Sequence, residues 1–183
     1  MRIAAVFVLL IACAPKEKPH RDFLYNPDTF TQSQLDQLLE SVAIFNEAVG
    51  CSNTPVLNLR ATDQTDFKSR NNKSEIYIVP EMADHVGAVT SVMYNVSQYD
   101  PEEVDIKVSD IEPLLFIKDG VLTEIYYDYH SLYLHEFGHA FGLEHSDNEL
   151  DIMYRITIVN WSDLDVLERF TGQLRDIGVG CVL

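Results

Sequence analysis

The feature that most constrains the chain lies at residues 135–145, which read HEFGHAFGLEH. His135 and His139 are four residues apart, so on a helix their imidazoles project from the same face, one turn apart. Gly142 frees the chain to leave that helix, because glycine tolerates the left-handed backbone that ends many helices. The turn can then bring His145 back toward the first two histidines. The segment therefore predicts a helix that ends in a sharp reversal.

These side chains predict a catalytic zinc site. Three neutral imidazoles, from His135, His139 and His145, plus a water make an open site, whereas structural zinc sites close with four protein ligands, often cysteines. Glu136 stands beside the first histidine and can act as general base on a water in the open position. A non-catalytic binding or adhesion protein with a structural zinc is the alternative, and a zinc hydrolase of non-peptide amides stays open. Glu136 argues against a purely structural site, because it is not needed to hold the metal.

The same residues carry a resemblance to a known clan. The segment 135–145 resembles the extended zinc motif of the metzincins. Met153 follows this motif after a short loop, where metzincins place a methionine turn beneath the metal. Ser146, directly after the motif, and the pair Met153-Tyr154 are similar to the matrixin branch. The resemblance is strong over residues 129–172 and only topological before them.

The resemblance implies one α+β domain at residues 29–183. A metzincin-type catalytic domain has a twisted, mixed five-stranded sheet, mostly parallel with one antiparallel edge. A backing helix and the active-site helix pack on this sheet. A small C-terminal subdomain carries the Met-turn and a C-terminal helix, expected here at residues 161–172.

Hydrophobic periodicity and turn signals place the remaining elements. A capping box at Thr31 and Gln34, apolar residues at helical spacing and then Gly50 predict a first helix. Strand patterns predict strands at 56–60, 75–79, 87–94 and 104–108. A turn signal predicts a hairpin of strands at 114–117 and 121–125. Two further helices are expected, the zinc-site helix at about 128–141 and one that opens at 162–165.

The resemblance also implies an activity and its participants. The chain is expected to be an endopeptidase that uses one catalytic Zn²⁺ and cuts peptide bonds in proteins, with Glu136 as general base. Metzincin substrates lie extended along an edge strand above the zinc helix, which makes Gly87, Ala88 and Val89 the expected backbone partners. An ordinary sheet strand is the alternative for these three residues. Tyr154 is expected to line the site, either through a hydrogen bond near the zinc or by packing.

Signals for other metal ions are weaker. Oxygen ligands for Ca²⁺ are offered by three aspartates, Asp100, Asp105 and Asp110, which solvated loop carboxylates would explain equally well. The remaining histidines do not reproduce the second, structural zinc site of animal matrixins, because His20, His85 and His130 are scattered along the chain.

The N-terminus predicts export and lipid attachment. One positive charge precedes an apolar run that is too short to span a membrane and ends in LIAC at residues 10–13. This ending resembles the lipobox of bacterial lipoproteins, so we expect a signal peptide at 1–12 and an acylated Cys13. An ordinary secretory signal is the alternative. Residues 13–28 then predict a tether, and the protein is expected at the bacterial cell envelope, at the outer membrane or cell surface rather than the inner membrane.

Charge and cysteine content limit the partners. The chain has 29 acidic and 13 basic side chains and a formal charge of −16, which excludes nucleic acid as a partner. The expected partners are a protein or peptide substrate, and a membrane only through the N-terminal lipid, with the protein as a monomer. With Cys13 acylated, Cys51 and Cys181 form an even pair in an oxidising compartment, which predicts a disulfide. Two buried free thiols are the alternative.

Overall fold

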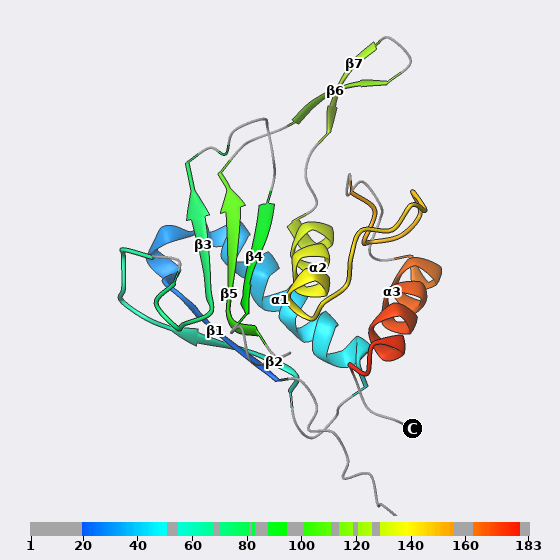
Figure 1. The fold of residues 1–183 in the computed structure, drawn as a ribbon. Coiled ribbons are helices and arrows are strands. Elements are labelled where there is room, and N and C mark those ends of the chain that lie inside the picture. The colour runs from blue at the N-terminus through cyan, green and yellow to red at the C-terminus, as the bar shows by residue number, and fades with distance from the viewer. Residues whose placement is uncertain are drawn as a thin grey trace, which may run out of the picture.

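Five strands form one sheet, and helices pack against one of its faces (Figure 1). The computed structural model describes residues 20–50, 55–67, 70–80, 82, 88–94, 101–110, 114–118, 121–125, 129–155 and 163–179. The strands are β1 (Arg21–Tyr25), β2 (Leu57–Ala61), β3 (Glu75–Val79), β4 (Ala88–Tyr94) and β5 (Pro101–Ser109). The helices are α1 (Gln32–Ala48), α2 (Tyr129–Ala140) and α3 (Leu164–Asp176), with a short 3-10 helix, η1 (Pro27–Thr29), before α1.

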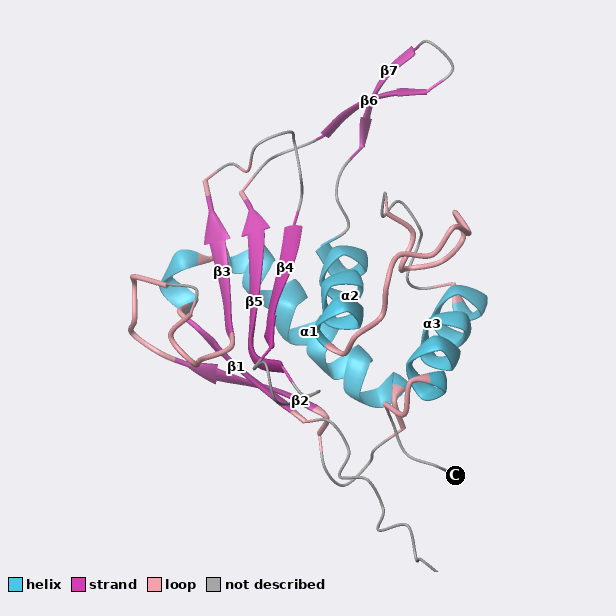
Figure 2. Ribbon diagram, viewed as in Figure 1, coloured by secondary structure: helices cyan, strands magenta, loops and turns pink. Residues whose placement is uncertain are grey.

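The sheet is mixed, with strand order β2-β1-β3-β5-β4. Neighbouring strands run parallel except β4, which pairs antiparallel with β5 at one edge. Ile76 of β3 and Ile106 of β5 are fully buried in the core to which the helices also contribute. Figure 2 shows the strands of the sheet and the helices beside them. The predicted α+β class and the mostly parallel sheet with one antiparallel edge are therefore confirmed.

Residues 21–25 correct the predicted tether, which was placed at residues 13–28. They form β1, which pairs with β2 on one side and with β3 on the other. Phe23 is fully buried, and it is the one buried residue of a strand that begins with two charged residues. A five-residue strand of this kind gives a weak hydrophobic pattern, so only its pairing with strands far along the chain reveals it.

Local signals set the ends of α1. The side chain of Thr31 accepts a hydrogen bond from the backbone of Gln34, and the Gln34 side chain accepts one from the backbone of Thr31, which confirms the capping box. Beyond the helix, Gly50 has φ of +69°, a left-handed conformation that favours glycine. Leu38 and Phe45 face the core without exposure to solvent.

A separate antiparallel pair of strands, β6 (Leu114–Lys118) and β7 (Val121–Ile125), confirms the predicted hairpin. It follows β5 and precedes α2, and it projects from the sheet-and-helix layers in Figure 1.

The ring of Phe45 joins the three α-helices. Its centroid lies 5.7 Å from that of Phe137 on α2 and 6.2 Å from that of Phe170 on α3. Edge-to-face ring contacts of this kind add to the burial of apolar surface. The C-terminal helix is therefore docked on the same core as the helix that carries the zinc motif.

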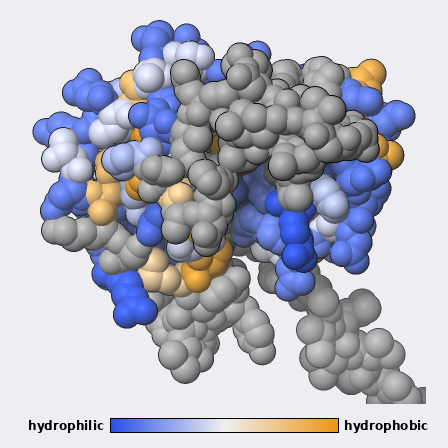
Figure 3. Space-filling view, turned by 90° about the horizontal axis from the view of Figure 1, so that it is seen from above, coloured by the Kyte–Doolittle hydropathy of each residue, from blue (hydrophilic) through white to orange (hydrophobic). Residues whose placement is uncertain are grey.

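Polar side chains cover most of the face seen in Figure 3. On this face the described residues are mostly hydrophilic, with apolar side chains in small areas. No helix in the described part of the chain has the length and apolar character of a membrane-spanning segment.

Candidate metal centre

Three histidine side chains meet at one point beside α2. The Nε2 atoms of His135 and His139 lie 3.0 Å apart, and those of His139 and His145 lie 3.2 Å apart. His135 and His139 come from successive turns of α2, as their spacing predicts. Three imidazoles separated by up to ten residues in the sequence thus offer ligand atoms to a single ion.

The turn after α2 brings the third histidine into place. Gly142 has φ of +98°, in the left-handed region, and the backbone N–H of Leu143 donates to the carbonyl of Gly138 at 2.9 Å. This ends the helix and reverses the chain. The predicted role of Gly142 as a helix stop before His145 agrees with this geometry.

Hydrogen bonds through the other ring nitrogen, Nδ1, orient two of the imidazoles. Nδ1 of His135 lies 2.7 Å from the carbonyl of Ile152, and Nδ1 of His139 lies 2.7 Å from the carbonyl of Leu143. A carbonyl only accepts, so each Nδ1 carries the proton and each Nε2 presents a lone pair. Burial also lowers the pKa of His135 to about 4, which keeps it neutral at pH 7.

The donor set fits zinc. Nε2 lone pairs that face one another repel unless a cation lies between them, and imidazole nitrogen is a preferred zinc ligand. Tetrahedral zinc with bonds of about 2.0–2.1 Å places its nitrogen ligands roughly 3.3 Å apart, close to the separations of 3.0 and 3.2 Å found here. Three protein ligands leave a fourth position open for water or substrate.

Glu136 lies next to this centre and is held by a neighbouring strand. Its side chain is 3% exposed, and Thr90 of β4 donates its hydroxyl to Oε2 at 2.5 Å. Burial raises the pKa of Glu136 to about 7, and the hydrogen bond from Thr90 opposes that rise. Sequence reasoning missed Thr90, because a threonine in a strand gives no sign of a partner 46 residues away.

Met153 packs against α2 at Gly138, which lies between His135 and His139 in the sequence. It is 1% exposed, and a Cβ added at Gly138 would lie 2.3 Å from its sulfur. The backbone N–H of Ser146 donates to the carbonyl of Met153 at 2.8 Å, which closes the loop that follows His145. The methionine singled out in the sequence is therefore brought against α2.

The predicted substrate-binding residues are only partly described. Ala88 and Val89 lie at the start of β4, whose second edge is unpaired among the described strands, and Val89 is 39% exposed. β4 also packs against α2. Tyr154 is half-buried at the end of the loop that carries Met153. Gly87 lies outside the described residues.

Several other predicted residues lie away from the centre. Asp105 is buried on β5, and Asp110 accepts a hydrogen bond from Gln34 at 3.0 Å. Within the described residues, the three histidines form the one group of histidine, cysteine or acidic side chains arranged to hold a metal ion. Four predicted residues, Asp100, Cys13, Cys51 and Cys181, lie outside the described part of the chain, as does His85.

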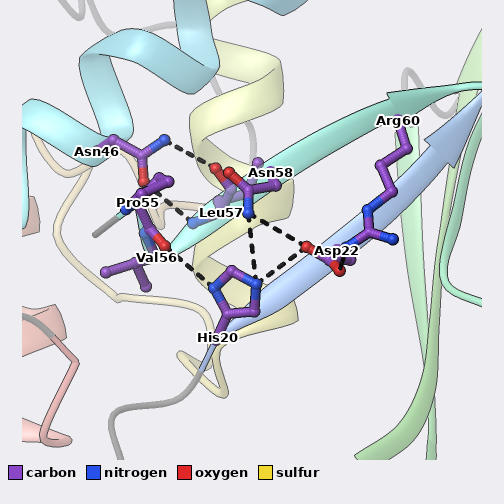
Figure 4. Close-up of polar contacts among 8 residues, drawn as sticks. All are labelled: His20, Asp22, Asn46, Pro55, Val56, Leu57, Asn58 and Arg60. Atoms are coloured by element: carbon purple, nitrogen blue, oxygen red, sulfur yellow. Dashed lines mark hydrogen bonds and ion pairs between the residues drawn. The ribbon is translucent and has the colours of Figure 1, made fainter. Parts of the chain in front are cut away.

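The two remaining histidines make structural contacts. Nδ1 of His130 lies 3.0 Å from the Ser41 hydroxyl, between α2 and α1. His20 lies against the carbonyl of Pro55 and the carboxylate of Asp22, where it ties the start of β1 to β2 (Figure 4). Neither belongs to the group of three histidines at the metal centre.

Part of the chain is similar to a known family, and the fold has distant structural matches. The family model described as Matrixin matches residues 118–166, a segment that contains all three histidines and Met153. Among 80 matching chains of solved structures is metalloproteinase-II from Bacteroides fragilis, at 15% identity and a TM-score of 0.47. That match covers 87% of this chain and 55% of the other, so the chain spans little more than half of its neighbour's length. No curated protein sequence matches the chain.

The group of three histidines lies in residues 118–166, the segment of the chain that matches the matrixin model. In this segment the chain resembles the matrixins, a branch of the metzincin zinc peptidases.

Proposed function

We propose that the protein is a zinc-dependent endopeptidase that hydrolyses peptide bonds in proteins. One observation carries the proposal: three imidazoles converge, with Nε2 of His139 3.0 Å from that of His135 and 3.2 Å from that of His145, and the buried Glu136 directly follows His135 on α2. A structural zinc site needs neither an open fourth position nor a neighbouring base.

The residues of the site have separate tasks. His135, His139 and His145 would hold Zn²⁺, which when bound lowers the pKa of a water and polarises a carbonyl group. Glu136 would accept the proton of the attacking water and deliver it to the leaving amine. Thr90 keeps the Glu136 carboxylate in one orientation through its hydroxyl. Met153 would support the histidine pair from below, as the Met-turn.

An extended peptide is the substrate that this geometry suits. The edge of β4 that is unpaired among the described strands begins at Ala88 and Val89 and offers backbone groups to an added strand. Gly87, which precedes them in the sequence, belongs to the same proposal. Main-chain hydrogen bonds of this kind would hold the peptide beside α2, because β4 packs on that helix. Tyr154, next to Met153, would line the site beside the metal centre.

We place the enzyme at the bacterial cell envelope, held by lipid on Cys13. The proposal rests on the lipobox-like ending of the apolar N-terminal run. Mass spectrometry of the protein purified from membranes tests it: a mature chain that begins at an acylated Cys13 is expected, and an unmodified N-terminus elsewhere would contradict it.

Zinc content and cleavage of a broad peptide library test the activity. Wild type and Glu136→Ala are both expected to bind one zinc, and only wild type is expected to cleave, with loss of at least about 100-fold in the variant. Glu144→Ala is the control, because Glu144 is an exposed carboxylate in the same motif. Zinc binding without cleavage by wild type would favour the alternative, a non-catalytic zinc-binding lipoprotein.

A further inference from the structure

The loop between His145 and Met153 brings the third histidine and the methionine to the same side of α2. Its ends are joined by the backbone hydrogen bond from Ser146 to Met153 and by a bridge between Ser146 and Tyr154. Between these ends the loop contains no helix or strand. Side-chain hydrogen bonds also hold the loop, and four of them are donated to one carboxylate.

That carboxylate belongs to Asp151, which is 6% exposed. Two donors come from the loop itself, the Ser146 hydroxyl at 2.7 Å and Nδ2 of Asn148 at 3.1 Å. Two come from α3, Nε of Arg169 at 2.8 Å and Nε2 of Gln173 at 3.3 Å. We call these five side chains the Asp151 hub. The hub fastens the loop to the C-terminal helix.

The hub is one residue away from two groups of the metal centre. Ser146 directly follows His145, so the bond from Ser146 to Asp151 restrains the backbone that carries the third imidazole. Ile152 directly follows Asp151, and its carbonyl accepts the hydrogen bond from Nδ1 of His135 at 2.7 Å. A shift of the hub would therefore displace His145 and weaken the hydrogen bond that orients His135.

Arg169 suits this position for reasons of charge and geometry. Its Nε bonds the Asp151 carboxylate, while its Nη2 donates to the carbonyl of Leu150 at 2.6 Å. A guanidinium makes two such directed bonds at once, whereas the single ammonium of a lysine does not reproduce the fork. A buried carboxylate that loses its cation is left with an uncompensated charge, which favours rearrangement of the loop.

We propose that Asp151 and Arg169 are positioning residues for the metal centre: through the hub, α3 orients His145 and His135 and thereby sets the affinity for zinc. The inference rests on the proposed zinc site and extends it to a helix that supplies no ligand. Partners behind metal ligands typically change metal affinity by about 10–100-fold when they are removed.

Zinc affinity, measured by competition with a chromophoric chelator, tests the hub without any peptide substrate. Arg169→Ala is expected to bind zinc about 10–100-fold more weakly than wild type. With Co²⁺ in place of zinc, its visible absorption bands should change in position or intensity, because the ligand geometry changes. Arg169→Lys keeps the charge but not the two directed bonds, so it should remain weaker than wild type.

Two control variants on α3 separate positioning from simple loss of stability. Leu174→Val removes buried apolar volume and Arg175→Ala removes an exposed arginine, and neither residue is a member of the hub. Both are expected to keep the zinc affinity and Co²⁺ spectrum of wild type. If Arg169→Ala does the same, while losing as much metal-free stability as Leu174→Val, the hub only holds the helix and the proposal is wrong.

Ser146→Ala provides a second test if Arg169→Ala does not fold, because it removes one donor and leaves α3 in place. A smaller but measurable loss of zinc affinity is expected, and unchanged affinity would overturn the proposal. The wild-type protein itself tests the proposed function: absence of zinc binding refutes the metal centre, whereas equal binding by wild type and hub variants refutes the hub alone.

Discussion

Gly138 lies between His135 and His139 on α2, and its lack of a side chain makes room for Met153. An added Cβ would meet the methionine sulfur at 2.3 Å and a ring carbon of Phe170 at 3.1 Å. Contacts this short cannot persist, so the methionine, the ring or the helix would have to move. Gly138 thus determines how closely the loop approaches α2, the helix that bears two of the metal ligands.

Substitution of Gly138 by alanine should therefore lower stability, although alanine favours helices. Overpacking of a filled core costs about 1–3 kcal/mol, and we expect a decrease of this size in the free energy of unfolding, measured with denaturant in metal-free protein. Gly172→Ala on α3 is the control, because no atom lies within 4 Å of an added Cβ there. It should leave stability unchanged or raise it by up to about 1 kcal/mol. Equal stability of wild type and Gly138→Ala would contradict the close contact.

At the scale of elements, the features predicted from sequence are those with local signals. The capping box at Thr31 and the turn at Gly142 act within a few residues, so α1 and the end of α2 follow from short patterns. β1 escaped prediction because its strand character depends on partners more than 30 residues away in the sequence. The contacts of Thr90 with Glu136, and of Arg169 with Asp151, escaped for the same reason: their sequence separations are 46 and 18 residues.

The contact between β4 and α2 gives a test of the general base. The Thr90 hydroxyl opposes the rise in the pKa of Glu136 that burial causes, so Thr90→Val should raise that pKa further. Because a general base must be ionised, the acidic limb of the pH profile of kcat/KM should move to higher pH. Thr90→Ser keeps the hydroxyl and should retain the wild-type limb. An unshifted limb in Thr90→Val would show that Glu136 does not titrate in catalysis.

At the scale of the whole molecule, the metal centre depends on three parts of the chain that pack together: α2, the loop after it and α3. Two imidazoles come from α2, the third from the loop beyond it, and that loop is fastened to α3. A native state with three oriented imidazoles binds zinc much better than an unfolded chain does. Metal binding should therefore contribute to folding stability.

Removal of zinc is expected to lower the Tm of the wild-type protein. At a free zinc concentration of about 100 times Kd, the metal adds roughly 2.7 kcal/mol to the free energy of unfolding, which a chelator would remove. Thermal unfolding with and without chelator measures the effect. His139→Ala loses one ligand, so the chelator should change its Tm much less. The same Tm in wild type with and without chelator would show that zinc does not favour the native state.

The position of β1 would matter if the protein is anchored through Cys13, as proposed. β1 lies between β2 and β3, hydrogen-bonded to both, and the segment before it leads to Cys13. If the domain is held through that cysteine while a substrate pulls on the active site, the load enters along the length of β1. The hydrogen bonds of β1 with β2 and β3 would then share that load, because β1 pairs with a strand on each side.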